Sequence, residues 1–300
     1  MRVKAQASSR IGLLDRPRLR RTGRLIHTQR DGSSAGTRAR LKRILRAAFL
    51  ALVSGSTATQ LAAQNPTPPA SISAPQPDSA RIKATRMAED ERLRNDWAYL
   101  QRYAKANAEL PAAALDEERV VFMGNSITES WSPYFASMFP GKPYINRGIG
   151  GQTTPQMLVR FRQDVIALKP KVVVILAGTN DIAGNTGPAT LEMIENNLTS
   201  MVELAKANGI RVVLASVLPV YSYLWRPSVQ PVQTIAALNQ WMRDYARNNG
   251  IVYLDYYSSM VDEKLGLRKD LTPDGVHPNE VGYRVMAPLT VSAIQEALRK

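Results

Sequence analysis

The sequence contains no cysteine and only two histidines, His27 and His277, in 300 residues. Without cysteine there is no disulfide framework, no thiol nucleophile and no residue for thioether-linked lipid. The scarcity of histidine also argues against the common zinc-ligand sets, which combine several histidines and cysteines. We therefore expect no metal and no other cofactor.

Acidic residues are scarce only in the N-terminal region. The net charge is +14, but residues 1–63 hold 14 of the 39 Lys and Arg residues and two of the 25 Asp and Glu residues. Residues 64–300 thus carry 25 basic and 23 acidic residues and are nearly neutral. A surface that binds nucleic-acid phosphates has no support in this composition, and no nucleic-acid partner is expected.

The N-terminal region also lacks an apolar run long enough to span a bilayer. Its basic stretch "RARLKRILR" leads into the short apolar run "AAFLALVSG" and the small-residue stretch "STATQLAAQ". This order predicts that residues 1–63 are a basic leader with a signal peptide, cleaved near Ala62 or Ala63. The mature protein is then exported, periplasmic or secreted, without stable membrane insertion. A disordered basic arm on a cytoplasmic protein is the alternative.

A proline-rich stretch, "NPTPPASISAPQPDS", follows the leader. This composition predicts an extended linker over residues 64–80, and a folded domain over residues 81–300. The spacing of Leu93, Trp97, Leu100 and Ala104 predicts a helix at the start of that domain, since all four fall on one helical face.

Short apolar runs then alternate with segments of helical spacing. The runs are "VVFM" (120–123), "PYIN" (143–146), "VVVILA" (172–177), "RVVLASVL" (211–218) and "IVYLDY" (251–256). Strands that are apolar throughout and alternate with helices indicate a parallel sheet covered on both faces. The predicted fold is α/β, a three-layer α/β/α sandwich with about five parallel strands. In such sheets ligands bind beyond the carboxyl ends of the strands.

His277 is the candidate general base, because it is the one histidine outside the leader. Asp274 precedes it by three residues, so a single turn can bring the carboxylate to the imidazole. A serine hydroxyl becomes a nucleophile when such an oriented base removes its proton. Ser126 fits this role because it follows the first apolar run, where Gly124 permits a tight exit from the strand. Taken alone, Ser126 also fits a helix N-cap.

Acyl transfer further requires hydrogen-bond donors for the oxyanion that develops in the transition state. Gly151 can offer a backbone N–H in a glycine-rich loop, and Asn180 can offer its side-chain amide in "GTND". Taken alone, each residue is better explained by an ordinary turn, a flexible turn at Gly151 and an Asx-turn at Asn180.

Four blocks resemble those of the SGNH hydrolases, also called GDSL-type esterases and lipases. They are "FMGNSITES", "INRGIGGQTT", "AGTND" and "DGVHPN", in the family's order within residues 118–282. The resemblance implies a flavodoxin-like fold, Ser126 as nucleophile, His277 as base and Asp274 as the residue that orients it. It also implies an oxyanion hole formed by the Ser126 N–H, the Gly151 N–H and the Asn180 amide.

The sequence departs from the family at one position of the first block, where Asn125 replaces the aspartate of "GDS". We expect altered hydrogen bonding in this loop without loss of activity. A competing motif, "GSSAG" at residues 32–36, fits the nucleophile elbow of α/β-hydrolases, but it lies in the leader without flanking strand or helix patterns.

The resemblance predicts a serine esterase acting on a small-molecule or glycan ester, and we favour short acyl groups such as acetyl on a carbohydrate. Aromatic residues near the site are candidate substrate contacts or packing residues: Trp131, Tyr221, Tyr223 and Trp225. Lysophospholipase or thioesterase activity, acyl transfer, and a catalytically inactive binding module of the cell envelope are the alternatives. The sequence does not indicate the oligomeric state.

Overall fold

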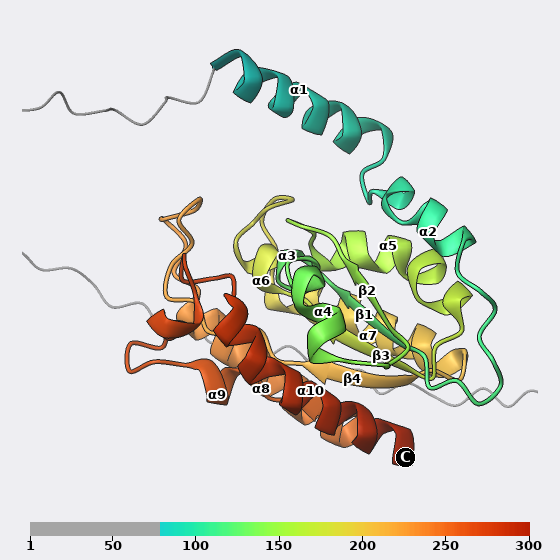
Figure 1. Cartoon of the computed structure of the whole chain (residues 1–300). Helices are drawn as coiled ribbons and strands as arrows, with labels where there is room; N and C mark the ends of the chain where they lie inside the picture. The colour runs from blue at the N-terminus through green and yellow to red at the C-terminus, as the bar shows by residue number, and fades with distance from the viewer. Residues whose placement is uncertain (1–78) are drawn as a thin grey trace, which may run out of the picture. The chain divides into compact units, whose positions relative to one another are not determined.

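The computed structural model describes residues 79–300 (Figure 1). The predicted leader and all but the end of the predicted linker lie outside this part of the chain. Helix α1 spans Ser79–Asn95, and two short helices follow, η1 (Leu100–Arg102) and α2 (Ala104–Ala108). The prediction of one continuous helix through Leu93 and Ala104 is wrong, because the helix is interrupted between α1 and η1.

The break has a local cause in Asp96. Its carboxylate accepts hydrogen bonds from the backbone N–H groups of Leu100 (2.6 Å) and Gln101 (2.9 Å), and Tyr99 adopts a left-handed conformation with φ of 55°. An aspartate that captures backbone donors in this way competes with the helix and restarts it as a separate turn.

The sheet has five parallel strands, which confirms the predicted architecture. They are β1 (Val120–Gly124), β2 (Tyr144–Gly148), β3 (Val172–Leu176), β4 (Arg211–Ala215) and β5 (Val252–Leu254). Their spatial order is β2-β1-β3-β4-β5. Gly124 at the end of β1 pairs with Gly148 on one side and Leu176 on the other. The loops that follow these three strands therefore begin side by side.

Helices connect the strands and cover the sheet (Figure 1). The remaining helices are α3 (Ser126–Glu129), α4 (Ser132–Met138), α5 (Thr154–Asp164), η2 (Ile166–Leu168), α6 (Thr179–Ile182), α7 (Leu191–Ala207), α8 (Val232–Asn249), α9 (Tyr257–Met260), η3 (Lys269–Leu271) and α10 (Glu280–Arg299). Within residues 79–300 no helix is both long enough and apolar enough to cross a membrane.

Alternate residues of each strand enter two separate apolar cores. On one face, Val121 and Val173 pack with side chains of α5, α7 and α8, such as Phe161 of α5. On the other face, Phe122 and Val174 pack with side chains of α3, α4 and α10. Burial on both faces explains why β1 and β3 are apolar throughout, whereas the edge strand β2 is only partly buried and includes Asn146 and Arg147.

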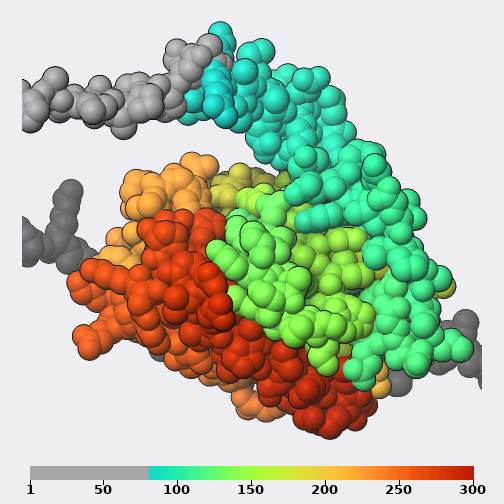
Figure 2. Space-filling view, viewed as in Figure 1, coloured from blue at the N-terminus to red at the C-terminus, as the bar shows by residue number. Residues whose placement is uncertain are grey.

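Helix α10 fixes the C-terminal region against the helix that follows β1. The Tyr283 hydroxyl donates a hydrogen bond to the Ile127 carbonyl (2.8 Å), and its ring stacks on Trp131 with centroids 5.1 Å apart. In Figure 2 the red C-terminal segment lies directly against the green segment that contains α3 and α4. Because α10 begins three residues after His277, this contact sets the position of the preceding turn relative to Ser126.

Candidate active site

Ser126 is the first residue of α3 and follows β1 after a single intervening residue. The turn is tight because Gly124 has no side chain; a Cβ there would lie 2.0 Å from the Thr128 Oγ1. The Arg160 guanidinium and the Ile149 N–H both donate to the Gly124 carbonyl, at 2.9 and 3.1 Å. The end of β1 is thus held from two sides, and Ser126 is presented at the carboxyl edge of the sheet.

Asn125 acts as the N-cap of α3. Its side-chain oxygen accepts a hydrogen bond from the Ile127 N–H (3.0 Å), and the residue is almost completely buried. An aspartate could accept the same bond but would bring a charge into this buried position. The structure therefore gives Asn125 a defined role at the position where it departs from the "GDS" motif.

The turn at residues 274–277 brings the candidate base to the candidate nucleophile. The His277 Nε2 lies 2.9 Å from the Ser126 Oγ, across 151 positions of sequence. The His277 Nδ1 lies 2.7 Å from the Asp274 Oδ2. Because a carboxylate only accepts, the Nδ1 carries the proton that it donates to Asp274, and Nε2 is left to accept from the serine hydroxyl.

Asp274 is itself held by the turn that contains it. Its Oδ1 accepts hydrogen bonds from the backbone N–H groups of Val276 (2.9 Å) and His277 (2.8 Å). Burial raises the pKa of the Asp274 carboxyl, but the hydrogen bonds from His277 and Val276 outweigh this and hold the pKa below its ordinary value. Asp274 is consequently an anion in the pH range in which histidine exchanges protons.

Thr272 organises the same turn and was not identified from the sequence. Its hydroxyl accepts the N–H groups of Asp274 (3.2 Å) and Gly275 (2.9 Å) and donates to the His277 carbonyl (2.7 Å). Gly275 has φ of 81°, a left-handed conformation that glycine adopts without strain. A threonine two residues before Asp-Gly is a recognisable turn pattern that could have indicated this role.

The glycine-rich loop after β2 lies next to the nucleophile. The Gly150 N–H donates to the Glu129 carboxylate of α3 (2.8 Å), which also pairs with Arg102 at 3.0 Å. A Cβ at Gly150 would lie 3.8 Å from the Ser126 Cβ. Gly151 follows with φ of 74°, again in the left-handed region. Glu129 thus fixes the loop that carries Gly151 to the helix that carries Ser126.

Asn180 lies on the short helix α6, directly after β3, and is buried. Its amide nitrogen donates to the Gln152 carbonyl (2.9 Å), which belongs to the residue after Gly151. An amide nitrogen has two hydrogens, and the second has no acceptor within the part of the chain that the structure describes. The structure therefore holds Asn180 at the loop of Gly151 with one donor available.

Asp181, the next residue, ties α6 to the start of α5. Its buried carboxylate accepts the backbone N–H of Thr154 (2.9 Å) and the Thr154 hydroxyl (2.5 Å). Burial raises the pKa of Asp181 to about 6, although the hydrogen bonds from Thr154 oppose this. Asp181 fixes the helix that carries Asn180 to the segment just after Gly151.

This raised pKa predicts a pH-dependent cost to stability. Between pH 3.8 and 6 the carboxyl ionises in the unfolded chain before it ionises in the folded one, so Asp181 lowers the free energy of unfolding as pH rises. Asp181→Asn removes this cost. The difference in unfolding free energy, Asp181→Asn minus wild type, should therefore be about 2 kcal/mol larger at pH 7.5 than at pH 4.5. Urea unfolding followed by tryptophan fluorescence measures this, and a difference that is constant with pH would contradict it.

The four candidate aromatic contacts divide into two pairs. Trp131 and Tyr223 are buried; the Trp131 indole contacts the Met138 sulfur, and the Tyr223 hydroxyl bonds Thr179. The structure therefore corrects the prediction of substrate contact for Trp131 and Tyr223. Both side chains pack in the apolar cores, as the alternative interpretation expected.

Tyr221 and Trp225 are 63% and 42% exposed and remain candidates for substrate contact. The Trp225 indole N–H donates to the Asn185 side chain (3.1 Å), whose amide donates to the Gly151 carbonyl (3.2 Å). Trp225 is thereby linked through one residue to the loop beside Ser126.

The arrangement as a whole is suited to attack by an oxygen nucleophile on a carbonyl carbon. It combines a hydroxyl in contact with an oriented imidazole, and the loop of Gly151, to which Asn180 is bonded, lies beside the hydroxyl. Within residues 79–300, no group of three or more histidine, aspartate or glutamate side chains is placed to hold a metal ion.

Comparison with known proteins supports the same chemistry. The model of the GDSL-like lipase/acylhydrolase family matches residues 122–285, which include all four blocks. A crystal structure from Bacteroides fragilis shows 52% identity and a TM-score of 0.67, covering 68% of this chain and 99% of that one. A GDSL-like lipase from Bacteroides thetaiotaomicron shows 46% identity and a TM-score of 0.66, covering 67% of this chain and 100% of that one.

Two curated relatives are more distant. The lipoprotein YqeF of Bacillus subtilis, which is uncharacterized, is 25% identical over 168 residues, covering 47% of this chain and 69% of that protein. An acetylxylan esterase of Xylanibacter ruminicola is 26% identical over 222 residues, covering 62% of this chain and 45% of that protein. The chain thus spans less than half of the length of that esterase.

Proposed function

Because the chain belongs to the GDSL-like lipase/acylhydrolase family and is a hydrolase of carboxylic esters, we propose that Ser126, His277 and Asp274 are its catalytic triad. The observation that carries this proposal is the continuous contact from the Ser126 Oγ to the His277 Nε2 (2.9 Å) and from the Nδ1 to Asp274 (2.7 Å). These contacts support the proposal because acyl transfer requires an imidazole whose Nδ1 proton is held by a carboxylate and whose Nε2 is free to accept the serine proton.

The reaction proceeds through an acyl-enzyme. The Ser126 Oγ attacks the ester carbonyl carbon while the His277 Nε2 takes the hydroxyl proton. The tetrahedral intermediate collapses as the C–O bond to the alcohol breaks and Nε2 returns the proton to the leaving oxygen. Water then attacks the acyl-enzyme, Nε2 takes its proton and returns it to Ser126, and the carboxylic acid is released. Asp274 stabilises the imidazolium at both stages.

The oxyanion is stabilised by the Ser126 N–H, the Gly151 N–H and the Asn180 amide. Loss of one such donor lowers kcat by about 10²- to 10³-fold in enzymes of this type. Support for this set comes from the two bonds that hold it, Gly150 N–H to Glu129 (2.8 Å) and Asn180 to the Gln152 carbonyl (2.9 Å).

The proposed substrate is a short acyl group, such as acetyl, on a carbohydrate. The relative named acetylxylan esterase favours this chemistry at 26% identity. The exposed rings of Tyr221 and Trp225 are suited to stacking on sugar rings. The protein is proposed to be exported, on the basis of its N-terminal charge pattern and a relative named as a lipoprotein.

Substrate preference tests this proposal. We expect kcat/KM for p-nitrophenyl acetate to exceed that for the palmitate ester by at least about 100-fold, and acetylated xylo-oligosaccharides to release acetate. EDTA should leave both rates unchanged. Preference for the long chain would instead indicate a lipase. An acyl group transferred to an added sugar rather than to water would indicate an acyltransferase. No hydrolysis above the Ser126→Ala background would indicate an inactive binding module.

A further inference from the structure

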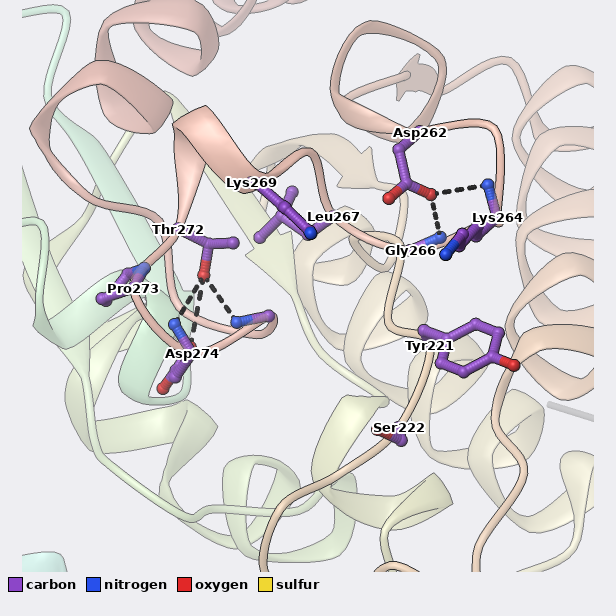
Figure 3. Close-up of a pocket in the computed structure, with 11 residues that line it drawn as sticks. Tyr221, Ser222, Asp262, Lys264, Gly266, Leu267, Lys269, Thr272, Pro273 and Asp274 are labelled. Atoms are coloured by element: carbon purple, nitrogen blue, oxygen red, sulfur yellow. Dashed lines mark hydrogen bonds between the residues drawn. The ribbon is translucent and has the colours of Figure 1, made fainter.

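The two parts of the proposed site are held in different ways. The turn that carries Asp274 closes on itself, and Figure 3 shows the Thr272 hydroxyl bonded to the Asp274 backbone N–H (3.2 Å), two residues further on. The loop that carries Gly151 is bonded instead to segments that lie far from it in sequence. The position of the proposed oxyanion donors therefore depends on those segments.

One of these segments is the chain between α1 and α2, residues 96–103, which we call the N-terminal strap. Three glutamine side-chain amides donate hydrogen bonds to its backbone carbonyls. The bonds join Gln152 to Ala98 (2.7 Å), Gln156 to Trp97 (2.8 Å) and Gln163 to Leu100 (2.7 Å). The strap lies outside residues 122–285, which the family model matches, so this support is additional to the four sequence blocks.

Gln152 differs from the other two glutamines because it lies in the oxyanion loop itself. It directly follows Gly151 and is only 3% exposed. Its backbone carbonyl accepts the hydrogen bond from the Asn180 amide (2.9 Å). A shift of Gln152 would therefore displace both proposed donors, Gly151 through the adjoining backbone and Asn180 through this bond.

The Gln152 side chain is fixed at both of its polar atoms. Its Oε1 accepts a hydrogen bond from the Arg160 Nε (2.5 Å), and its Nε2 donates to the Ala98 carbonyl (2.7 Å). A guanidinium only donates and a carbonyl only accepts, so one orientation of the amide satisfies both partners. The position thus requires an acceptor and a donor on the same side chain.

Arg160 links this anchor to the nucleophile. It is completely buried, and its Nη2 donates to the carbonyl of Gly124, two residues before Ser126 (2.9 Å). Its Nη1 pairs with the buried Asp164 carboxylate (3.0 Å), which balances the charge. Because the guanidinium is planar and rigid, it holds the end of β1 and the Gln152 side chain at a fixed separation.

We propose that Gln152 is a positioning residue of the oxyanion hole. Anchored by Arg160 on one side and by the N-terminal strap on the other, it keeps the Gly151 N–H and the Asn180 amide directed at the oxyanion that forms when Ser126 attacks. This rests on the proposed function. Loss of the anchor falls on the transition state, because the donors act on a charge that the ground state lacks.

Gln152→Met in the full chain tests this inference, because it removes both polar groups of the anchor. We expect kcat for p-nitrophenyl acetate to fall by about tenfold or more with KM within about twofold, since a misplacement of about 1 Å can cost about 10²-fold. Gln152→Glu keeps the acceptor for Arg160 and loses only the donor to Ala98, so it leaves no buried charge unpaired. It should lower kcat by about threefold or more, and it carries the test if the methionine variant does not fold.

Gln163→Met is the matched control. It removes the same kind of bond between α5 and the strap, but its amide bonds the Leu100 carbonyl rather than a residue beside Gly151. It should keep kcat within about twofold, with rates normalised to the folded fraction from urea unfolding. Wild-type kcat in folded Gln152 variants, or an equal loss in Gln163→Met, would overturn the positioning role. Failure of the proposed function is read separately, from a wild type that hydrolyses no faster than Ser126→Ala.

Discussion

Replacement of Ser126 by alanine is expected to lower kcat for p-nitrophenyl acetate by about 10⁴-fold or more. The Ser126 Oγ is the atom in contact with the His277 Nε2, at 2.9 Å, and alanine leaves the imidazole without a hydroxyl to activate. KM should change little, because the loss falls on the chemical step rather than on binding. Initial rates at saturating substrate measure the effect.

Ser137 provides a matched control for this variant. It is an exposed serine on α4, and its hydroxyl donates to the Tyr134 carbonyl (2.9 Å) rather than to any residue of the proposed triad. Ser137→Ala should retain wild-type kcat. If Ser126→Ala kept more than a tenth of the wild-type rate, Ser126 would not be the nucleophile.

Asp274→Asn is expected to lower kcat by about 10⁴-fold while leaving the fold intact. The asparagine Oδ1 can still accept the Val276 and His277 backbone N–H groups, which places its NH₂ group against the His277 Nδ1. The imidazole must then carry its proton on Nε2, where it can no longer accept the proton of Ser126. Steady-state kinetics and circular dichroism together separate this effect from unfolding.

The neighbouring Asp270 distinguishes a specific role from a general charge effect. Asp270→Asn removes a carboxylate only four positions away that pairs with Arg268 at the surface, and it should leave kcat within about twofold. A comparable rate loss in both variants, or less than a tenfold loss in Asp274→Asn, would contradict the orienting role of Asp274.

The fold could be predicted from the sequence because its signals are local. A strand buried on both faces has an apolar side chain at nearly every position, and the runs of β1 and β3 meet this condition independently of what they pack against. The runs of β2, β4 and β5 include polar residues and are recognised from their apolar centres and their alternation with helical segments. The site blocks could be located for the same reason, since Ser126, Gly151 and Asn180 each lie in the loop that follows a predicted strand. The alternation of strands and helices then places these strand ends at one edge of the sheet.

The polar groups that support the site could not be found in this way. Arg160 is completely buried on α5, where its guanidinium bonds Gly124, Gln152 and Asp164, yet its position in sequence resembles any surface position of an amphipathic helix. Asp181 likewise depends on Thr154, 27 positions earlier. Such bonds become visible only when tertiary structure brings distant residues together.

Aromatic residues were ambiguous for a related reason. Trp131 and Trp225 are the same residue type, each near a site loop in sequence, but only the second is substantially exposed. Size and apolarity suit a core and a sugar-binding surface equally well. Burial, which decides between them, depends on α10 and on the contact between Tyr283 and Trp131.

Covalent labelling tests the central claim, activation of Ser126 by His277, most directly. A fluorophosphonate probe reacts with an activated serine and leaves a stable adduct that peptide mass spectrometry locates. The geometry predicts one adduct, on Ser126, in the wild type, and strongly reduced labelling in His277→Ala. An adduct on another residue, or undiminished labelling of Ser126→Ala, would contradict it.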